Sequence, residues 1–207
     1  MAGPMRARVW ACLGVLVPSV AAAGFEPATP RPGAAGWTVE AGDHLLDVGV
    51  PDDPAHPRLW EAEPLVIRHT GGSCHVGGLG PLAAVHVDVS GGRALVTSVS
   101  GSYTLLATVR LADCMVLDRL PAFTGTLQVQ DDEVVTAAAC ECGDDHAPCV
   151  CHAAQVVSVT PEGRLLDRPD DPRVERLTRE TLGVGFTGRA LVDSPGTPRA
   201  RLVAPLH

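Results

Sequence analysis

The sequence Gly91-Gly92-Arg93-Ala94-Leu95-Val96 occurs again, almost unchanged, as Thr187-Gly188-Arg189-Ala190-Leu191-Val192, 96 residues further along the chain. Leu117-Asp118-Arg119 returns after 49 residues as Leu166-Asp167-Arg168. The two spacings are close to one period and two periods of the same length. They indicate an internal repeat of about 49 residues.

Short Val- and Leu-rich runs fill each period and are separated by Gly, Asp and Pro, which is typical of strands joined by turns. Gly42 to Val50 also aligns with Gly91 to Val99 at 49 residues. Val85-His86-Val87-Asp88-Val89 alternates apolar and polar residues, as a half-buried strand does. The sequence therefore predicts an all-β fold with four strands in each unit. The expected strands are 37–40, 44–50, 58–62 and 65–69, then 83–89, 93–99, 103–111 and 114–120, then 126–130, 133–140, 152–160 and 164–167.

This succession of strand, Gly-Arg-Ala-Leu-Val, strand and closing Leu-Asp-Arg resembles the blades of extracytoplasmic β-propeller repeat proteins over residues 37–207. The resemblance implies four-stranded antiparallel blades in units of about 37–79, 80–125, 126–170 and 182–207. The last unit begins near Leu182 and lacks its final strand. Three explanations stay open: the N-terminal segment completes the last blade, the chain is part of a longer protein, or the fold is a small β-sandwich.

Residues 1–23 have the pattern of a secretory signal peptide. Arg6 and Arg8 precede an apolar run from Val9 to Val20, and Ala21-Ala22-Ala23 offers a small-residue cleavage site. The run is shorter than the ~20 residues that a membrane-spanning helix needs. We therefore expect a secreted or periplasmic protein with no membrane span after cleavage. Residues 24–36, rich in Pro, Gly and Ala, are expected to form a linker that does not pack.

One helix is expected near residues 172–182. Asp171 can cap it, Pro172 suits its first position and Gly183 can end it. Val174, Leu177 and Thr181 have the spacing of an apolar helix face. The charged residues between them are expected to form the solvated face: Arg173, Glu175, Arg176, Arg179 and Glu180.

Six cysteines follow the expected cleavage site. Aligning the second and third units places an insertion of about nine residues between Cys140 and Cys151, and we expect it to extend a β-hairpin. In such a hairpin Cys140 opposes Cys151 and Cys142 opposes Cys149, with all four sulfurs on one face. In an oxidising compartment these become two cross-strand disulfides.

Cys74 and Cys114 are then left to pair with each other. The alternative is a set of four thiolates at the hairpin that bind zinc or copper, with His146 or His152 as an added ligand. Export favours the disulfides, so no cofactor is expected.

The formal net charge of −8 and the aromatic content of 3% argue against nucleic acid as a partner. Gly71-Gly72-Ser73-Cys74-His75 places a nucleophile beside a histidine, but adjacent residues on such a loop point apart. The acidic pairs fit turns better than calcium sites: Asp52-Asp53, Asp131-Asp132 and Asp144-Asp145. The histidines His44, His56, His69, His75 and His86 have no ligand spacing.

The sequence thus predicts an exported, non-catalytic binding or scaffold module with a protein or cell-surface partner. If the fold is a propeller, the cysteine insertion and the helix lie on one side, where a partner would bind. Two other functions stay open. One is the propeller part of a larger extracytoplasmic redox enzyme, and the other is a metal-binding protein that uses the four-cysteine hairpin.

Overall fold

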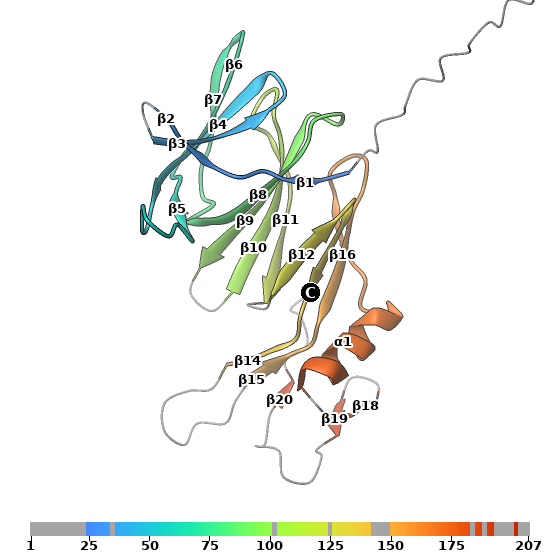
Figure 1. Ribbon diagram of the computed structural model, residues 1–207. Coiled ribbons are helices and arrows are strands. Elements are labelled where there is room, and N and C mark those ends of the chain that lie inside the picture. The colour runs from blue at the N-terminus through green and yellow to red at the C-terminus, as the bar shows by residue number, and fades with distance from the viewer. Residues whose placement is uncertain are drawn as a thin grey trace, which may run out of the picture.

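The computed structural model describes residues 24–33, 36–100, 103–123, 126–141, 150–182, 185–187, 190–192 and 201–202 (Figure 1). The expected signal peptide lies outside these ranges. Antiparallel strands dominate the described chain, with one helix, α1 (Pro172–Leu182). No helix in these ranges is long and apolar enough to cross a membrane. The strands are β1 (Glu26–Pro27), β2 (Arg31–Gly33), β3 (Gly36–Ala41), β4 (His44–Pro51), β5 (Trp60–Glu61), β6 (Leu65–His69), β7 (Gly72–Val76), β8 (Leu82–Asp88), β9 (Arg93–Ser100), β10 (Tyr103–Arg110), β11 (Val116–Phe123), β12 (Leu127–Gln130), β13 (Glu133–Thr136), β14 (Ala139–Glu141), β15 (Val150–His152), β16 (Gln155–Val159), β17 (Leu165–Asp167), β18 (Gly185–Thr187), β19 (Ala190–Val192) and β20 (Arg201–Leu202).

The centre of the fold is a four-stranded antiparallel meander, β8-β9-β10-β11, which we call the middle sheet. It is buried on both faces. Along β9, Ala94 and Val96 belong to one hydrophobic core, whereas Leu95 between them belongs to another. A strand between two layers needs such a continuous apolar run, because both sets of its side chains leave water.

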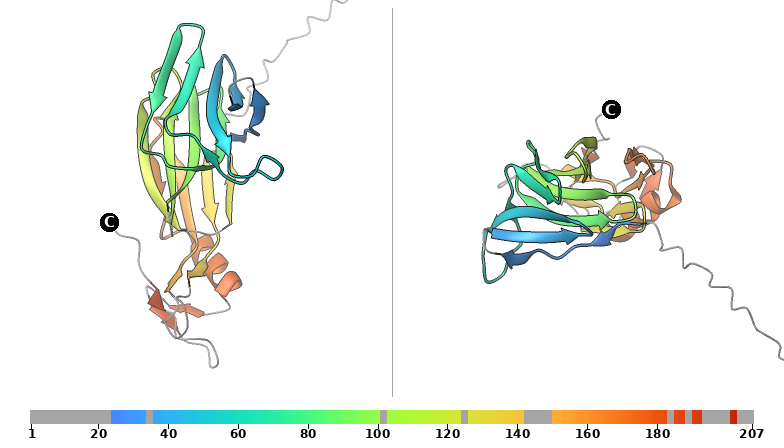
Figure 2. Two further views of the ribbon diagram at one scale, coloured as in Figure 1. Left: turned by 90° about the vertical axis from the view of Figure 1, so that its left-hand side faces the viewer. Right: turned by 90° about the horizontal axis from the view of Figure 1, so that it is seen from above.

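A sheet packs on each face of the middle sheet. The first sheet has the order β3-β4-β6-β7, and its Val39, Leu46 and Ile67 share one core with Ala94 and Val96 of the middle sheet. The third sheet has the order β12-β13-β16-β17 and packs on the other face. Viewed from above in Figure 2, the blue-to-cyan strands and the green strands lie in adjacent layers.

The first three expected units correspond to these three sheets, and the first unit differs from the expectation in two strands. In the first unit the expected strand at 58–62 is only the short β5, which pairs with both β4 and β8. The fourth strand of that sheet is β7, which was expected to be a loop. Within the described residues the three sheets form an open stack and do not close into a ring or barrel.

Residues 25–33, which we call the N-terminal strap, contradict the expectation of an unpacked linker. The backbone N–H of Phe25 donates to the carbonyl of Asp131 at 2.9 Å, β1 pairs with β8, and β2 pairs with β3. Phe25 is 3% exposed. The strap therefore runs across all three sheets, as the blue segment of Figure 1 shows. Composition predicted a linker because Pro and Gly weaken strands, yet edge pairing tolerates them.

Helix α1 begins where the sequence predicts, but its buried face differs. Asp171 accepts a hydrogen bond from the backbone N–H of Arg173 at 2.9 Å, as a capping residue does. Val174 and Thr178 are buried, whereas Thr181 is exposed, so the expectation for Thr181 is wrong. Thr178 lies four residues after Val174 and therefore on the same face. The expected helix end at Gly183 lies outside the described residues.

Candidate functional site

The two ends of the stacked sheets differ in what they carry. The turn end holds the tight turns β3–β4, β8–β9, β10–β11, β12–β13 and β16–β17. The connection end holds the segments that run between sheets and the longer loops within them. These loops include the β13–β16 excursion with its cysteines. Because neighbouring strands are antiparallel, the two sets of segments must lie at opposite ends.

The buried side chain of Arg93 bonds to the middle sheet and to the third sheet at the turn end. Its guanidinium donates to Asp88 from Nε at 3.1 Å and from Nη2 at 2.5 Å. It also donates to the carbonyls of Thr160 and Pro161 in the third sheet, and it lies 5.3 Å from the ring centre of Phe25. Burial raises the pKa of Asp88, but hydrogen bonds from Arg93 and other donors outweigh it and leave that pKa below its usual value. The carboxylate and the guanidinium thus form a buried ion pair within the middle sheet, and the same guanidinium joins that sheet to the third.

A second set of bonds fixes the β16–β17 turn on the middle sheet. Thr108 donates through its hydroxyl to the carbonyl of Gly163. Asp118 accepts from Arg164 Nε and from the backbone N–H of Leu165, both at 2.9 Å. The polar groups in these contacts are used to hold the third sheet on the middle sheet, and they are not free to bind a partner.

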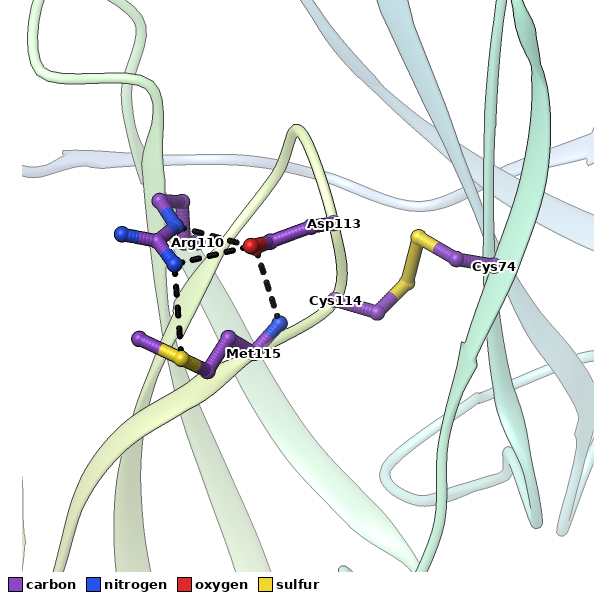
Figure 3. Close-up of a disulfide and its surroundings, with 5 residues drawn as sticks. All are labelled: Cys74, Arg110, Asp113, Cys114 and Met115. Atoms are coloured by element: carbon purple, nitrogen blue, oxygen red, sulfur yellow. Dashed lines mark hydrogen bonds and ion pairs between the residues drawn. A yellow bond between two sulfur atoms is a disulfide. The ribbon is translucent and has the colours of Figure 1, made fainter.

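The Cys74–Cys114 disulfide joins the first sheet to the middle sheet at this end (Figure 3). Its Cα atoms are 5.7 Å apart. Cys114 has a positive φ of 59°, which few residues other than glycine adopt. Asp113 beside it accepts from Arg110 at 2.8 and 2.9 Å and from the N–H of Met115. Because Cys74 is in a disulfide, the Ser73-Cys74-His75 sequence has no free thiol that could act as a nucleophile.

The strands that flank the cysteine insertion, β14 and β15, lie at the connection end. Cys140 of β14 is paired in register with Cys151 of β15, and the two form a disulfide. Both disulfides of the described chain are pairs that hairpin alternation and elimination predict. The expected Cys142–Cys149 pair and His146 lie outside the described residues. The hairpin is less regular than expected, because the strand expected at 133–140 is split into β13 and β14.

The disulfide bears on the metal alternative. Zinc and copper(I) bind thiolates, and the sulfurs of Cys140 and Cys151 are bonded to each other. His152 of β15 is buried, with 9% of its surface exposed. Across the described residues no group of three or more His, Cys, Asp or Glu side chains is arranged to hold a metal ion.

Helix α1 is fastened beside the cysteine hairpin (Figure 1). The hydroxyl of Thr178 accepts from the backbone N–H of Ala154 at 2.9 Å, just after β15. At the other end of the helix, Arg173 binds both oxygens of Glu133 at 2.7 and 3.0 Å and also binds Asp171. Hydrogen bonds from Arg173 lower the pKa of Asp171 to about 2. The helix is therefore held to the third sheet at both ends.

The exposed side of α1 carries balanced charge. Arg179 pairs with Glu175 at 2.5 Å, and Arg176 lies 4.0 Å from Glu180. These four side chains are all more than half exposed and bond to no other element in the described ion pairs. They confirm the expected solvated face, except that Arg173 turns inward to Glu133.

Two further carboxylates at the connection end accept hydrogen bonds from the backbone N–H groups of loops. Glu63 accepts from three successive N–H groups, those of Gly78, Leu79 and Gly80, at 2.9–3.2 Å. These bonds lower the pKa of Glu63. Asp52 accepts from the N–H groups of Arg58 and Leu59 at 3.0 Å and so closes its own loop. This bonding supports the interpretation of Asp52-Asp53 as turn residues rather than calcium ligands.

The histidines are scattered, as the sequence suggests. His44 and His69 are cross-strand neighbours with ring centres 5.7 Å apart, and His69 Nδ1 accepts from the N–H of Gly71. His56 lies 3.6 Å from Asp53 on the surface. His86 of β8 is paired in register with Pro27 of the strap and is partly buried, and burial lowers its pKa. No protein-family model matches the chain, and the search of curated proteins finds no significant match.

Proposed function

We propose that this protein is an exported, non-catalytic binding module whose three sheets are successive β-propeller-type blades. A protein or cell-surface partner binds at its connection end. The contrast between the two ends carries the proposal. Side chains at the turn end are used to bond one sheet to another, whereas the connection end carries the helix, the cysteine hairpin and the long loops. Binding residues commonly lie on such loops above a rigid scaffold.

The layered arrangement supports blades rather than a two-sheet sandwich. Each sheet is a four-stranded antiparallel meander, and the middle one is buried on both faces. Helix α1 contacts β16, whose Val156 is fully buried on the face away from the middle sheet. The helix thus occupies the face on which a further blade would pack and acts as a cap.

Binding of the labelled protein to cells of its own species tests the proposal. The full chain is expressed with its first 23 residues and recovered from the exported fraction, and mass spectrometry gives its first residue and its disulfides. The variant Glu175→Arg/Arg179→Glu reverses the exposed ion pair of α1 without deleting it. We expect this variant to bind at least tenfold more weakly.

The matched control is Asp47→Arg/Arg68→Asp, which reverses an ion pair on the first sheet. We expect it to bind like the wild type. Equal loss in both variants, or no binding of the wild type, contradicts the proposed surface. Stoichiometric zinc or copper on reduced cysteines would instead support the metal-binding alternative.

A further inference from the structure

The acidic turn Asp131-Asp132 contains one buried carboxylate oxygen with no hydrogen-bond donor among the described residues. Oδ1 of Asp132 is buried and accepts no hydrogen bond from the described residues. Burial raises the pKa of Asp132, and the nearby charges of Asp88 and Asp131 act in the same direction. Arg93 is the nearby cation, but its guanidinium is already bonded to Asp88, Thr160 and Pro161. The turn therefore has a buried acceptor and an excess of negative charge.

The start of the strap lies against this turn. The N–H of Phe25 donates to the carbonyl of Asp131 at 2.9 Å. A Cβ atom built on Gly24 would lie 3.0 Å from the Cα of Asp131, so the backbone of Gly24 is packed on it. The nitrogen of Gly24 therefore lies next to the turn that carries these two acidic residues.

We propose that the Asp131-Asp132 turn is a binding site for the α-ammonium group of Gly24, which forms when the signal peptide is removed. The inference rests on the proposed export. Hydrolysis of the Ala23–Gly24 peptide bond consumes one water and leaves a carboxylate on Ala23 and an ammonium on Gly24. The new cation supplies the donor that Asp132 lacks, and it locks the strap across the three sheets. Cleavage thereby completes the fold.

Three forms of residues 24–207 test the pairing, and this span keeps every element that the structure describes. One begins with the free amine of Gly24, one is acetylated there, and one carries a Gly-Ser extension. At pH 7 we expect the free-amine form to have a Tm higher by about 2–4 °C. Pairing raises the pKa of the amine, so the advantage is complete at pH values just below about 7.7, the usual pKa of an α-amino group. It is lost as the pH rises through the higher, folded pKa of the amine, and also at acid pH, where the two carboxylates take up protons.

The variant Asp131→Asn/Asp132→Asn must abolish this difference between the three forms. Asp43→Asn, an exposed acid in the β3–β4 turn, is the control and must preserve it. Equal Tm values for all three forms, or a difference that survives in Asp131→Asn/Asp132→Asn, would overturn the inference. The first residue of the exported protein tests the proposed function separately. If residues 1–23 are retained, export by cleavage fails, while the prepared chains still report on the pairing.

Discussion

At the scale of single residues, Arg93 joins three parts of the fold. One guanidinium bonds to Asp88 on the middle sheet and to two carbonyls on the third, and it stacks on Phe25 of the strap. The two charged side chains are 8% and 2% exposed. A charge so far from water is stable only while its partner is present.

Replacing Arg93 with Leu should therefore be strongly destabilising. Asp88 keeps Ser90 and the N–H of Gly91 but loses its cation, and we expect a loss of about 3–5 kcal/mol in the free energy of unfolding. Urea denaturation measures it. Arg68→Leu breaks a more exposed pair with Asp47 and should cost no more than about 1 kcal/mol. Similar losses in the two variants would show that the Arg93 pair is not buried in solution.

His86 should make stability depend on pH. Burial lowers its pKa in the folded state, so the unfolded chain takes up its proton first as the pH falls. The contribution of neutral His86 is complete above about pH 6.5, the usual histidine pKa, and is lost as the pH falls towards the lower, folded value. His86→Phe should flatten the stability profile over that interval. An unchanged profile would contradict this assignment.

Some contacts of single residues can be predicted from the sequence and others cannot. The Cys140–Cys151 pair follows from strand alternation, a local rule, and Cys74–Cys114 follows by elimination. The sequence identifies Arg93 only as part of a repeated strand. Its bonds to the carbonyls of Thr160 and Pro161 join residues far apart in the chain, so no local pattern predicts them. The sequence Asp88-x-Ser90-Gly91-x-Arg93 offered one signal, a carboxylate five residues before the arginine across a tight turn.

At the scale of elements, the two threonines of α1 show that helical spacing alone does not determine which residues are buried. Both Thr178 and Thr181 lie at helical spacing from Val174, so periodicity alone does not choose between them. Packing on β16 chooses Thr178, whose hydroxyl accepts from Ala154 and donates to the carbonyl of Val174. The boundaries of most strands, by contrast, were predicted to within two or three residues.

Thr178→Val is a near-isosteric test of that contact. It leaves the buried N–H of Ala154 without an acceptor, which should cost about 1–3 kcal/mol. Thr181→Val makes the same chemical change at an exposed position and should alter stability by no more than about 0.5 kcal/mol. Thermal unfolding of both variants decides the matter. A larger effect at Thr181 would restore the face that the sequence suggested.

At the scale of the whole molecule, the disulfides differ in what they join. Cys74–Cys114 links two sheets and closes 40 residues, whereas Cys140–Cys151 lies within one hairpin and closes 11. Chain entropy then predicts losses of about 4 and about 3 kcal/mol for Cys74→Ser/Cys114→Ser and Cys140→Ser/Cys151→Ser. Denaturant titration measures both. A greater loss for the hairpin pair would mean that its contacts, rather than the loop length, determine its contribution.

The repeat predicted the four-stranded sheets but not the segments that pack against them, which are the strap and α1. Strand count and order follow from patterns inside each unit, such as the alternation of Val85 to Val89. The positions of α1 and of the crossing strap depend on contacts between units, which no local sequence pattern records. Residues 24–36 illustrate this, because Pro and Gly predicted a linker while Phe25 is buried beside Arg93.

The strap also constrains the order in which the chain can fold. Phe25 emerges early during synthesis, but its partner Asp131 follows about 106 residues later. At the usual pace of translation this is a wait of roughly 5–20 s, during which the segment is extended and unpaired. Pro27, Pro30 and Pro32 lack the N–H group that another strand would need, which protects the nascent chain from premature pairing and aggregation. The strap can therefore complete its docking only after the β12–β13 turn that contains Asp131 has been made.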